Sequence, residues 1–211
     1  MKTQMKFQKI LTLITLITAA LAIVLALSFC TGVFEAVRHY SIKMAEEDIW
    51  GGDALYVYSN GINDMLLIMA IVLLLSVILL CVMGCNKRRN YYITNYVAIG
   101  IFAVYALVFG IVLLIICANC LNLYGKIDFA AWREYENETQ IGVGGELVYS
   151  HSRYYNDSCA TIYLGIVMFV VLLVEIAAWV LNLIWKIKLM KGEKALLEQG
   201  AVEKTAEMEV A

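Results

Sequence analysis

The chain has 211 residues, of which 62% are hydrophobic and only 16% are charged; it contains no proline, and its mean hydropathy is +0.77. Soluble domains average about 45–50% apolar and about 25% charged residues, so the composition excludes an ordinary soluble globule and a disordered chain. A net charge of -2 also argues against a nucleic-acid binder that relies on a basic surface. The composition therefore predicts an integral membrane protein.

Four stretches of the chain are long and apolar enough to cross a bilayer. A hydrocarbon core of about 30 Å takes roughly 20 apolar residues in a helix, and lipid cannot satisfy the polar groups of an open backbone. None of the stretches alternates in the way that a membrane β-strand does. The sequence therefore predicts an all-α bundle of four transmembrane helices, over residues 10–30, 65–85, 96–120 and 160–185. Residues 1–211 form a single membrane domain in this interpretation, and residues 186–211 are a short charged cytoplasmic tail.

The first stretch resembles a signal peptide because Lys2, Lys6 and Lys9 precede it. Its apolar part is longer than the usual core of about 7–15 residues in a signal peptide. It also carries small residues at spacings that suit packing against other helices. We therefore expect it to remain in the protein as the first membrane helix.

The distribution of charged residues predicts the orientation. Eleven of the 16 Lys and Arg residues precede the first span, follow the fourth, or lie between the second and third. Cytoplasmic segments of membrane proteins carry such an excess. Both termini are therefore expected in the cytoplasm, with the protein in the plasma membrane. In the second outer segment, Asp128 is expected to cap a short helix that includes Phe129, Trp132 and Tyr135.

Glu175 is the one charged residue within the predicted spans. It lies about ten residues, roughly 15 Å, from the predicted inner boundary, and a carboxylate at that depth costs on the order of 2.5–3.5 kcal/mol. Asn182 follows seven residues later and shares its helix face. We expect both to form an intramembrane polar site that faces the bundle, with Thr15 or Thr18 as possible partners. This site is either a neutral acid bonded to a neighbouring helix or a proton or cation site.

Stripes of small residues predict close contacts between helices. Small side chains allow helices to approach in lipid, where burial of apolar surface provides little driving force. The residues expected at these contacts are Ala19, Ala22 and Ala26 in the first span, and Ala103, Ala106 and Gly110 in the third. The second span has few small residues, so we expect it to face lipid most.

Four cysteines lie near the predicted outer boundary: Cys30, Cys117, Cys120 and Cys159. They allow three complete pairings. We expect at least one disulfide among them, and Cys120–Cys159 is favoured because both residues border the same segment. The C-x-x-C pattern of Cys117 and Cys120 is typical of thiol oxidoreductases. Here, however, it closes a helix at the end where the helix dipole disfavours a thiolate.

Three functions remain open. The leading hypothesis is a non-enzymatic subunit, scaffold or accessory component that acts through helix packing and outer loops. Its partners would be the lipid bilayer, other membrane proteins or a second copy of itself. The alternatives are a small transporter or channel component that uses Glu175, and a membrane thiol oxidoreductase. No pattern predicts a catalytic, cofactor or metal site. Four spans with an acid in the fourth resemble tetraspanins, but residues 121–159 lack their Cys-Cys-Gly motif, so no family is assigned.

Overall fold

The computed structural model describes residues 2–29, 53–84, 93–131, 133–134 and 159–210. Four long helices contain nearly all of them: α1 (Lys2–Ser28), α3 (Asp53–Gly84), α4 (Ile93–Tyr124) and α7 (Ala160–Val210). No strand occurs within these ranges. Each helix includes a stretch that could cross a membrane, at Thr3–Ser28, Asp64–Gly84, Asn95–Tyr124 and Ala160–Leu196. The predicted all-α bundle of four membrane helices is confirmed.

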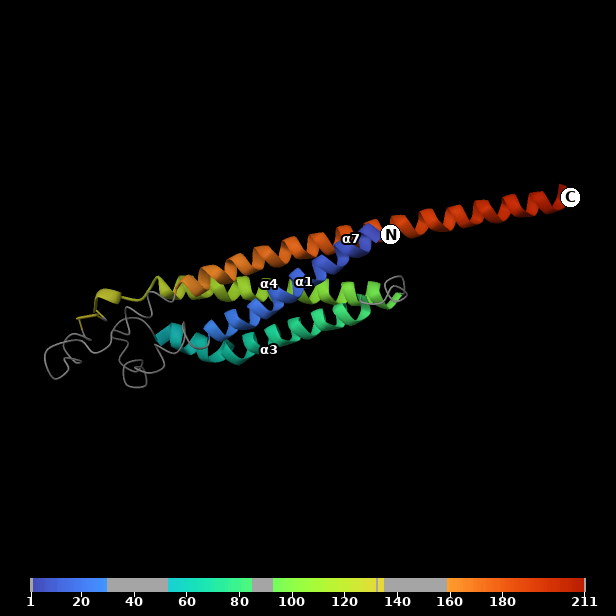
Figure 1. Ribbon diagram of the computed structural model, residues 1–211. Coiled ribbons are helices and arrows are strands. Elements are labelled where there is room, and N and C mark those ends of the chain that lie inside the picture. Colours follow the sequence, from blue (N-terminus) through green and yellow to red (C-terminus); the bar gives the residue numbers. More distant parts are fainter. Residues whose placement is uncertain (1, 30–52, 85–92, 132, 135–158, 211) are drawn as a thin grey trace.

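The helices form a ring in which neighbours along the chain are also neighbours in space. α1 packs on α3 and α7, and α4 packs on the same two helices, so α1 and α4 lie at opposite corners. This is the up-and-down arrangement of a four-helix bundle. Because the chain runs through the bundle four times, the N-terminus and the departing part of α7 lie at the same end (Figure 1). The assignment of that end to the cytoplasm stays a prediction.

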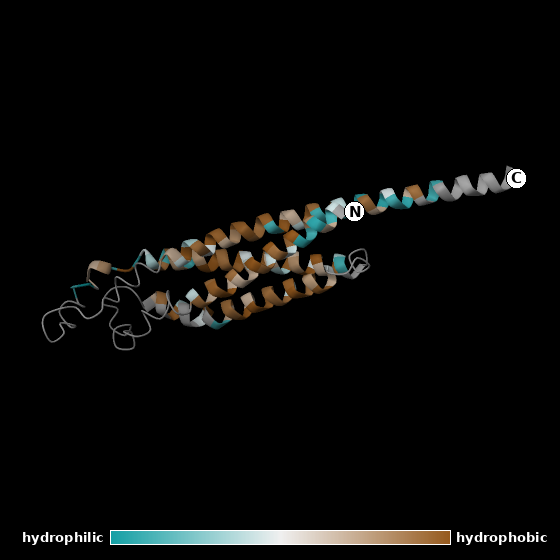
Figure 2. Ribbon diagram, viewed as in Figure 1, coloured by the Kyte–Doolittle hydropathy of each residue, from teal (hydrophilic) through white to brown (hydrophobic). Residues whose placement is uncertain are grey.

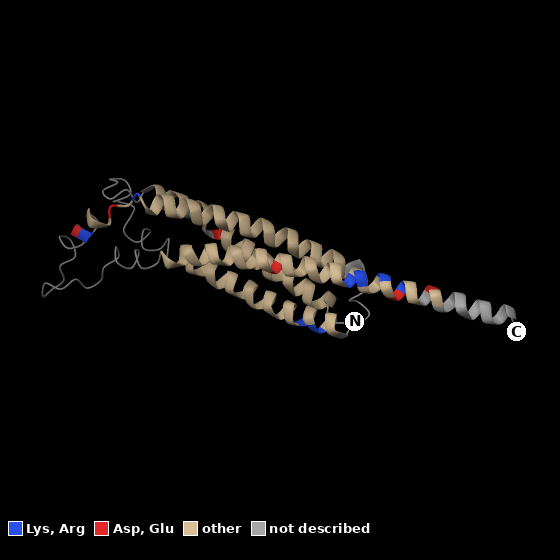
Figure 3. Cartoon of the chain, turned by 90° about the horizontal axis from the view of Figure 1, so that it is seen from above, with Lys and Arg blue, Asp and Glu red and all other residues tan. Residues whose placement is uncertain are grey.

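The outside of the bundle is apolar. Figure 2 shows hydrophobic residues along all four helices, with hydrophilic ones concentrated at the end that holds the N-terminus and on the projecting part of α7. Figure 3 shows basic residues gathered at this same end. Large aliphatic side chains such as Leu13, Ile68, Val104 and Leu181 are exposed on the four helices. Such a surface suits lipid rather than water as its solvent.

The helix with the least buried span is α7, not α3. Only 22% of the apolar stretch of α7 is buried inside the bundle, compared with 33% of the apolar stretch of α3. The expectation that the second span faces lipid most is therefore wrong. The number of small residues does not predict how much of a span is buried here. α3 instead buries large aliphatic side chains, which include Leu66, Leu73, Val77 and Leu80.

Asp128 caps the turn that follows α4. Its Oδ1 atom accepts hydrogen bonds from the backbone N–H groups of Ala130 and Ala131, each at 3.0 Å. These bonds satisfy donors that a helix start leaves open, and they confirm the predicted cap. Trp132 and Tyr135 lie outside the described residues.

Candidate functional site

Buried polar side chains line the contact between α1 and α7. We call this set the polar seam; it comprises Gln4, Gln8, Thr15 and Thr18 of α1 and Glu175, Trp179 and Asn182 of α7. Each member is at most 6% exposed. Their spacings of three, four or seven residues place them on one face of each helix. Hydrogen bonds across the helix contact join them at three levels.

The first level pairs Thr18 with Glu175. The Thr18 hydroxyl donates to Oε1 of Glu175 at 2.5 Å, and the Glu175 side chain is only 4% exposed. Thr18 is one of the two partners expected from the sequence. The second carboxyl oxygen, Oε2, has no hydrogen-bond partner among the described residues. One of the two carboxyl oxygens is therefore buried without a hydrogen bond from the described residues to offset its loss of water.

The second level joins Trp179 to Thr15. The indole Nε1 donates to Oγ1 of Thr15 at 3.0 Å, and that hydroxyl donates in turn to the backbone carbonyl of Leu11 at 2.8 Å. The Trp179 ring also meets Phe102 of α4 edge-on, with ring centroids 6.2 Å apart. This one side chain therefore ties α7 to both of its neighbours.

The third level is a cluster of three amides. Nε2 of Gln4 donates to Oδ1 of Asn182 at 2.9 Å and to Oε1 of Gln8 at 3.1 Å. Nδ2 of Asn182 lies 3.4 Å from the same Gln8 oxygen. Sequence reasoning found Asn182 but missed both glutamines, which it placed outside the first span. Their four-residue spacing, in phase with Thr15 and Thr18, was the signal that could have identified them.

Lys186 extends the buried face of α7 by one turn. Its side chain is fully buried, and its Nζ atom lies 4.9 Å from the ring centroid of Tyr96 in α4. The Tyr96 hydroxyl donates to Sδ of Met190 at 2.7 Å. The sequence predicts that Lys186 is the first residue of a charged tail. In the structure α7 continues without a break, and Lys186 faces the interior of the bundle. Attraction between an ammonium group and an aromatic face favours this position.

The predicted small residues lie at the helix contacts to different extents. The buried ones are Ala19, Ala22, Ala26, Ala106 and Gly110, whereas Ala103 is half-buried. A Cβ atom on Gly110 would lie 3.0 Å from Cδ2 of Phe169. The tightest approach is one that the sequence did not predict. A Cβ atom on Gly165 of α7 would overlap Sγ of Cys117 in α4.

The structure does not show the predicted Cys120–Cys159 disulfide, since both residues are free thiols in it. Cys120 is fully buried and faces the interior of the bundle, whereas Cys159 is half-buried just before α7 begins. Bordering the same segment of sequence did not bring their side chains together, because the helix face sets the direction of Cys120. Cys117 is also fully buried. Cys30 lies outside the described residues.

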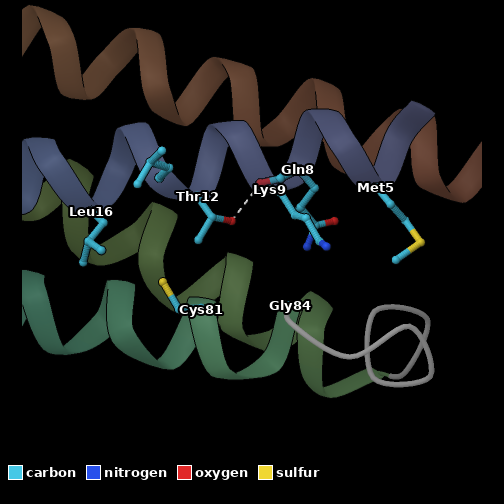
Figure 4. A pocket seen from close by; sticks show the side chains of 8 residues that line it. Met5, Gln8, Lys9, Thr12, Leu16, Cys81 and Gly84 are labelled. Carbon is cyan, nitrogen blue, oxygen red and sulfur yellow. Dashed lines mark hydrogen bonds between the residues drawn. The ribbon is translucent and has the colours of Figure 1, made fainter. Parts of the chain in front are cut away.

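Two grooves flank α1. One has a volume of about 260 Å³ and lies between α1 and α3, with Gln8 of the polar seam in its wall (Figure 4). The other has a volume of about 300 Å³ and lies between α1 and α7; apart from Thr18 and Ser28, its lining is apolar. Each groove therefore has one member of the polar seam in its wall, Gln8 in the first and Thr18 in the second.

Comparison of the chain with family models, with curated proteins and with solved structures finds no match.

Proposed function

We propose that the chain is a non-enzymatic multi-pass membrane protein that serves as a subunit or accessory component of a membrane assembly. One observation carries this proposal: the side chains of the polar seam bond mainly to one another. Thr18 bonds to Glu175, Trp179 bonds to Thr15, and Gln4 bonds to Asn182. Polar residues engaged in this way hold membrane helices together.

The burial of the C-x-x-C pair supports a packing role over thiol chemistry. Cys117 and Cys120 are both 0% exposed within α4. A catalytic thiol has to reach its substrate and is favoured as a thiolate by exposure or a nearby positive charge. The neighbours of Cys117 include Gly165, whose missing side chain makes room for the sulfur. Cys117 therefore serves the α4–α7 contact.

The surface of α7 supports the existence of a partner. Its span is the least buried of the four, and the helix continues beyond the bundle (Figure 1). A helix with a large free apolar face can pack against a helix of another membrane protein without disturbing its own bundle. We infer that α7 is the helix to which a partner binds.

Purification of the tagged chain from its own membranes in mild detergent tests the proposal. A partner should copurify with the wild type and with Glu175→Gln, because the seam does no chemistry. Gly110→Leu should lose the partner, since the new side chain collides with Phe169 and displaces α7, the helix to which the partner binds. Gly100→Leu on the same helix is the matched control, because a Cβ atom there meets nothing within 4 Å. A wild-type chain that purifies alone, fully folded, would contradict the proposal.

A second candidate function, a transporter or channel component, is favoured by the buried Oε2 atom of Glu175. This atom has no partner among the described residues, and ionisable groups inside membranes often mark ion or proton pathways. Liposomes that contain the purified protein and a pH-sensitive dye separate the two functions. Proton flux that Glu175→Gln abolishes, at unchanged stability, would establish transport. Absence of flux in the wild type would favour the assembly role.

A further inference from the structure

The groove between α1 and α3 lies at the end of the bundle that holds the N-terminus. Its volume is about 260 Å³. Figure 4 shows side chains of α1 on one side of it, among them Gln8, Thr12 and Leu16, and shows Cys81 and Gly84 of α3 on the other. It is distinct from the contacts of the polar seam with α7, although Gln8 belongs to both.

Gln8 directs a hydrogen-bond donor toward α3. Its Oε1 atom accepts from Gln4 and Asn182, so the amide nitrogen must point the other way. That Nε2 atom would lie 3.1 Å from a Cβ atom on Gly84, which places it beside the groove. The side chain is 3% exposed, and Nε2 has no partner among the described residues. A buried donor in this state favours any acceptor that enters the groove.

The lining of the groove changes from polar to apolar along α1. Lys9 is exposed beside Gln8 and is the last basic residue before the charge-free stretch 10–30. Leu13 and Leu16 line the groove further along the helix. Lys9 and Leu16 are separated by about 10 Å along the helix axis, at about 1.5 Å per residue. The predicted span over residues 10–30 therefore places a cation and an amide donor at headgroup depth, with aliphatic side chains below them.

We propose that this groove binds an anionic phospholipid. A phosphate oxygen accepts the hydrogen bond from Nε2 of Gln8 and pairs with the ammonium group of Lys9. One acyl chain lies along Leu13 and Leu16. The gathering of basic residues at this end of the bundle (Figure 3) selects a negative headgroup over a zwitterionic one, which brings its own cation. The site needs only insertion of the protein in a membrane and does not depend on the assembly role.

Lipid binding to the purified full-length chain tests the charge of the headgroup. Native mass spectrometry should show a preference for dioleoylphosphatidylglycerol over dioleoylphosphatidylcholine. Lys9→Gln should reduce this preference about fivefold, as expected for one basic residue near an anionic headgroup. Lys6→Gln removes the same charge from an exposed position of the same helix that does not line the groove. It should leave the preference unchanged, and an equal loss in both variants would overturn the proposal.

Gln8→Glu tests the amide donor. The new side chain keeps an acceptor for Gln4 and Asn182 but places a carboxyl oxygen where Nε2 lies, so the preference for the anionic lipid should disappear. If this variant does not fold, the comparison of Lys9→Gln with Lys6→Gln still decides. A folded Gln8→Glu protein that retains the full preference would overturn the role of the donor.

Cys81 reports where the lipid lies. Its thiol is half-buried in the wall of the groove, so bound phosphatidylglycerol should slow its alkylation by N-ethylmaleimide. Cys159, at the opposite end of the bundle, should react at an unchanged rate and serves as the internal control. Equal protection by phosphatidylcholine, or by inorganic phosphate alone, would overturn the assignment of an anionic lipid.

Discussion

Glycines determine how closely α4 and α7 approach each other. Gly165 leaves the space that the sulfur of Cys117 fills, and Gly110 leaves space for the ring of Phe169. In lipid, helices gain stability from such close packing because apolar burial contributes little. A single added methyl group at Gly165 therefore has to displace the sulfur of Cys117.

Gly165→Ala should lower the free energy of unfolding by about 1–3 kcal/mol, the usual cost of overpacking. Gly192→Ala is the matched control on the same helix, because a Cβ atom there meets nothing within 4 Å. It should be neutral, or stabilising by up to ~1 kcal/mol, because alanine favours a helix. Unfolding by sodium dodecyl sulfate in mixed micelles measures both. Equal effects of the two substitutions would show that the contact with Cys117 is not restrictive.

Glu175 stabilises the bundle through the acceptor that it offers to Thr18. Glu175→Gln keeps that acceptor, so the free energy of unfolding should change by less than about 0.5 kcal/mol. Glu175→Leu removes it and should cost roughly 0.6–1.7 kcal/mol, which are the average and the maximum measured for hydrogen bonds between membrane helices. Glu175→Lys should cost about 2.5 kcal/mol or more, because it places a cation near the middle of the membrane.

The same unfolding assay measures all three variants of Glu175. A glutamine variant as unstable as the leucine variant would mean that the carboxyl charge, not the acceptor, matters. That result would shift weight to the transport hypothesis.

The sequence predicted the Thr18–Glu175 end of the polar seam and Asn182, but not the two glutamines at the other end. Glu175 and Asn182 stand out because they are polar within an apolar run, and Thr18 follows from its position on the facing helix. Gln4 lies among lysines, so composition could not distinguish a buried glutamine from a solvated one. Only the direction of the helix face separates it from exposed Lys6.

The polar seam stabilises the contact between helices α1 and α7. It depends on Trp179 in particular, whose ring packs on Phe102 while its N–H group bonds to Thr15. The two contributions can be separated, since phenylalanine keeps the ring but lacks the donor.

Trp179→Phe should cost about 0.6–2 kcal/mol, whereas Trp179→Ala should cost about 3–5 kcal/mol because it also leaves a cavity. A double-mutant cycle with Thr15→Val measures the hydrogen bond itself, and we expect a coupling of at least ~0.5 kcal/mol. Thermal unfolding of the four purified proteins provides the numbers. Strictly additive effects would mean that the bond contributes nothing to stability.

The elements themselves were predictable, because long apolar runs without proline have few other structures available in lipid. Their contacts were less so. Cys120 was paired with Cys159 from chain order, but a helix residue is directed by its face, and Cys120 shares the buried face of Cys117 and Leu113. Lys186 was placed at a boundary because it is charged, although it lies four residues after buried Asn182 and therefore on the same inward face of the helix.

The end of α3 at Gly84 and the start of α7 at Ala160 lie at opposite ends of the bundle. The excess of basic residues in the sequence predicts that the segment after α3 is cytoplasmic. A reporter that works only in the cytoplasm should therefore be active when it is fused at Arg89. A reporter that works only outside should be active when it is fused at Gly144. The reverse pattern, with both fusions expressed equally, would contradict the orientation but leave the bundle intact.

The length of α7 has a mechanical consequence. From Lys186 to Val210 the helix continues for about 37 Å, at about 1.5 Å per residue, without a break in its backbone hydrogen bonding. A continuous helix that tilted about the polar seam would act as a lever arm. By this geometry, a tilt of only about 5° at Glu175 would displace the far tip by several ångströms. Whatever binds near Val210 would therefore sense small rearrangements deep in the bilayer as an amplified movement.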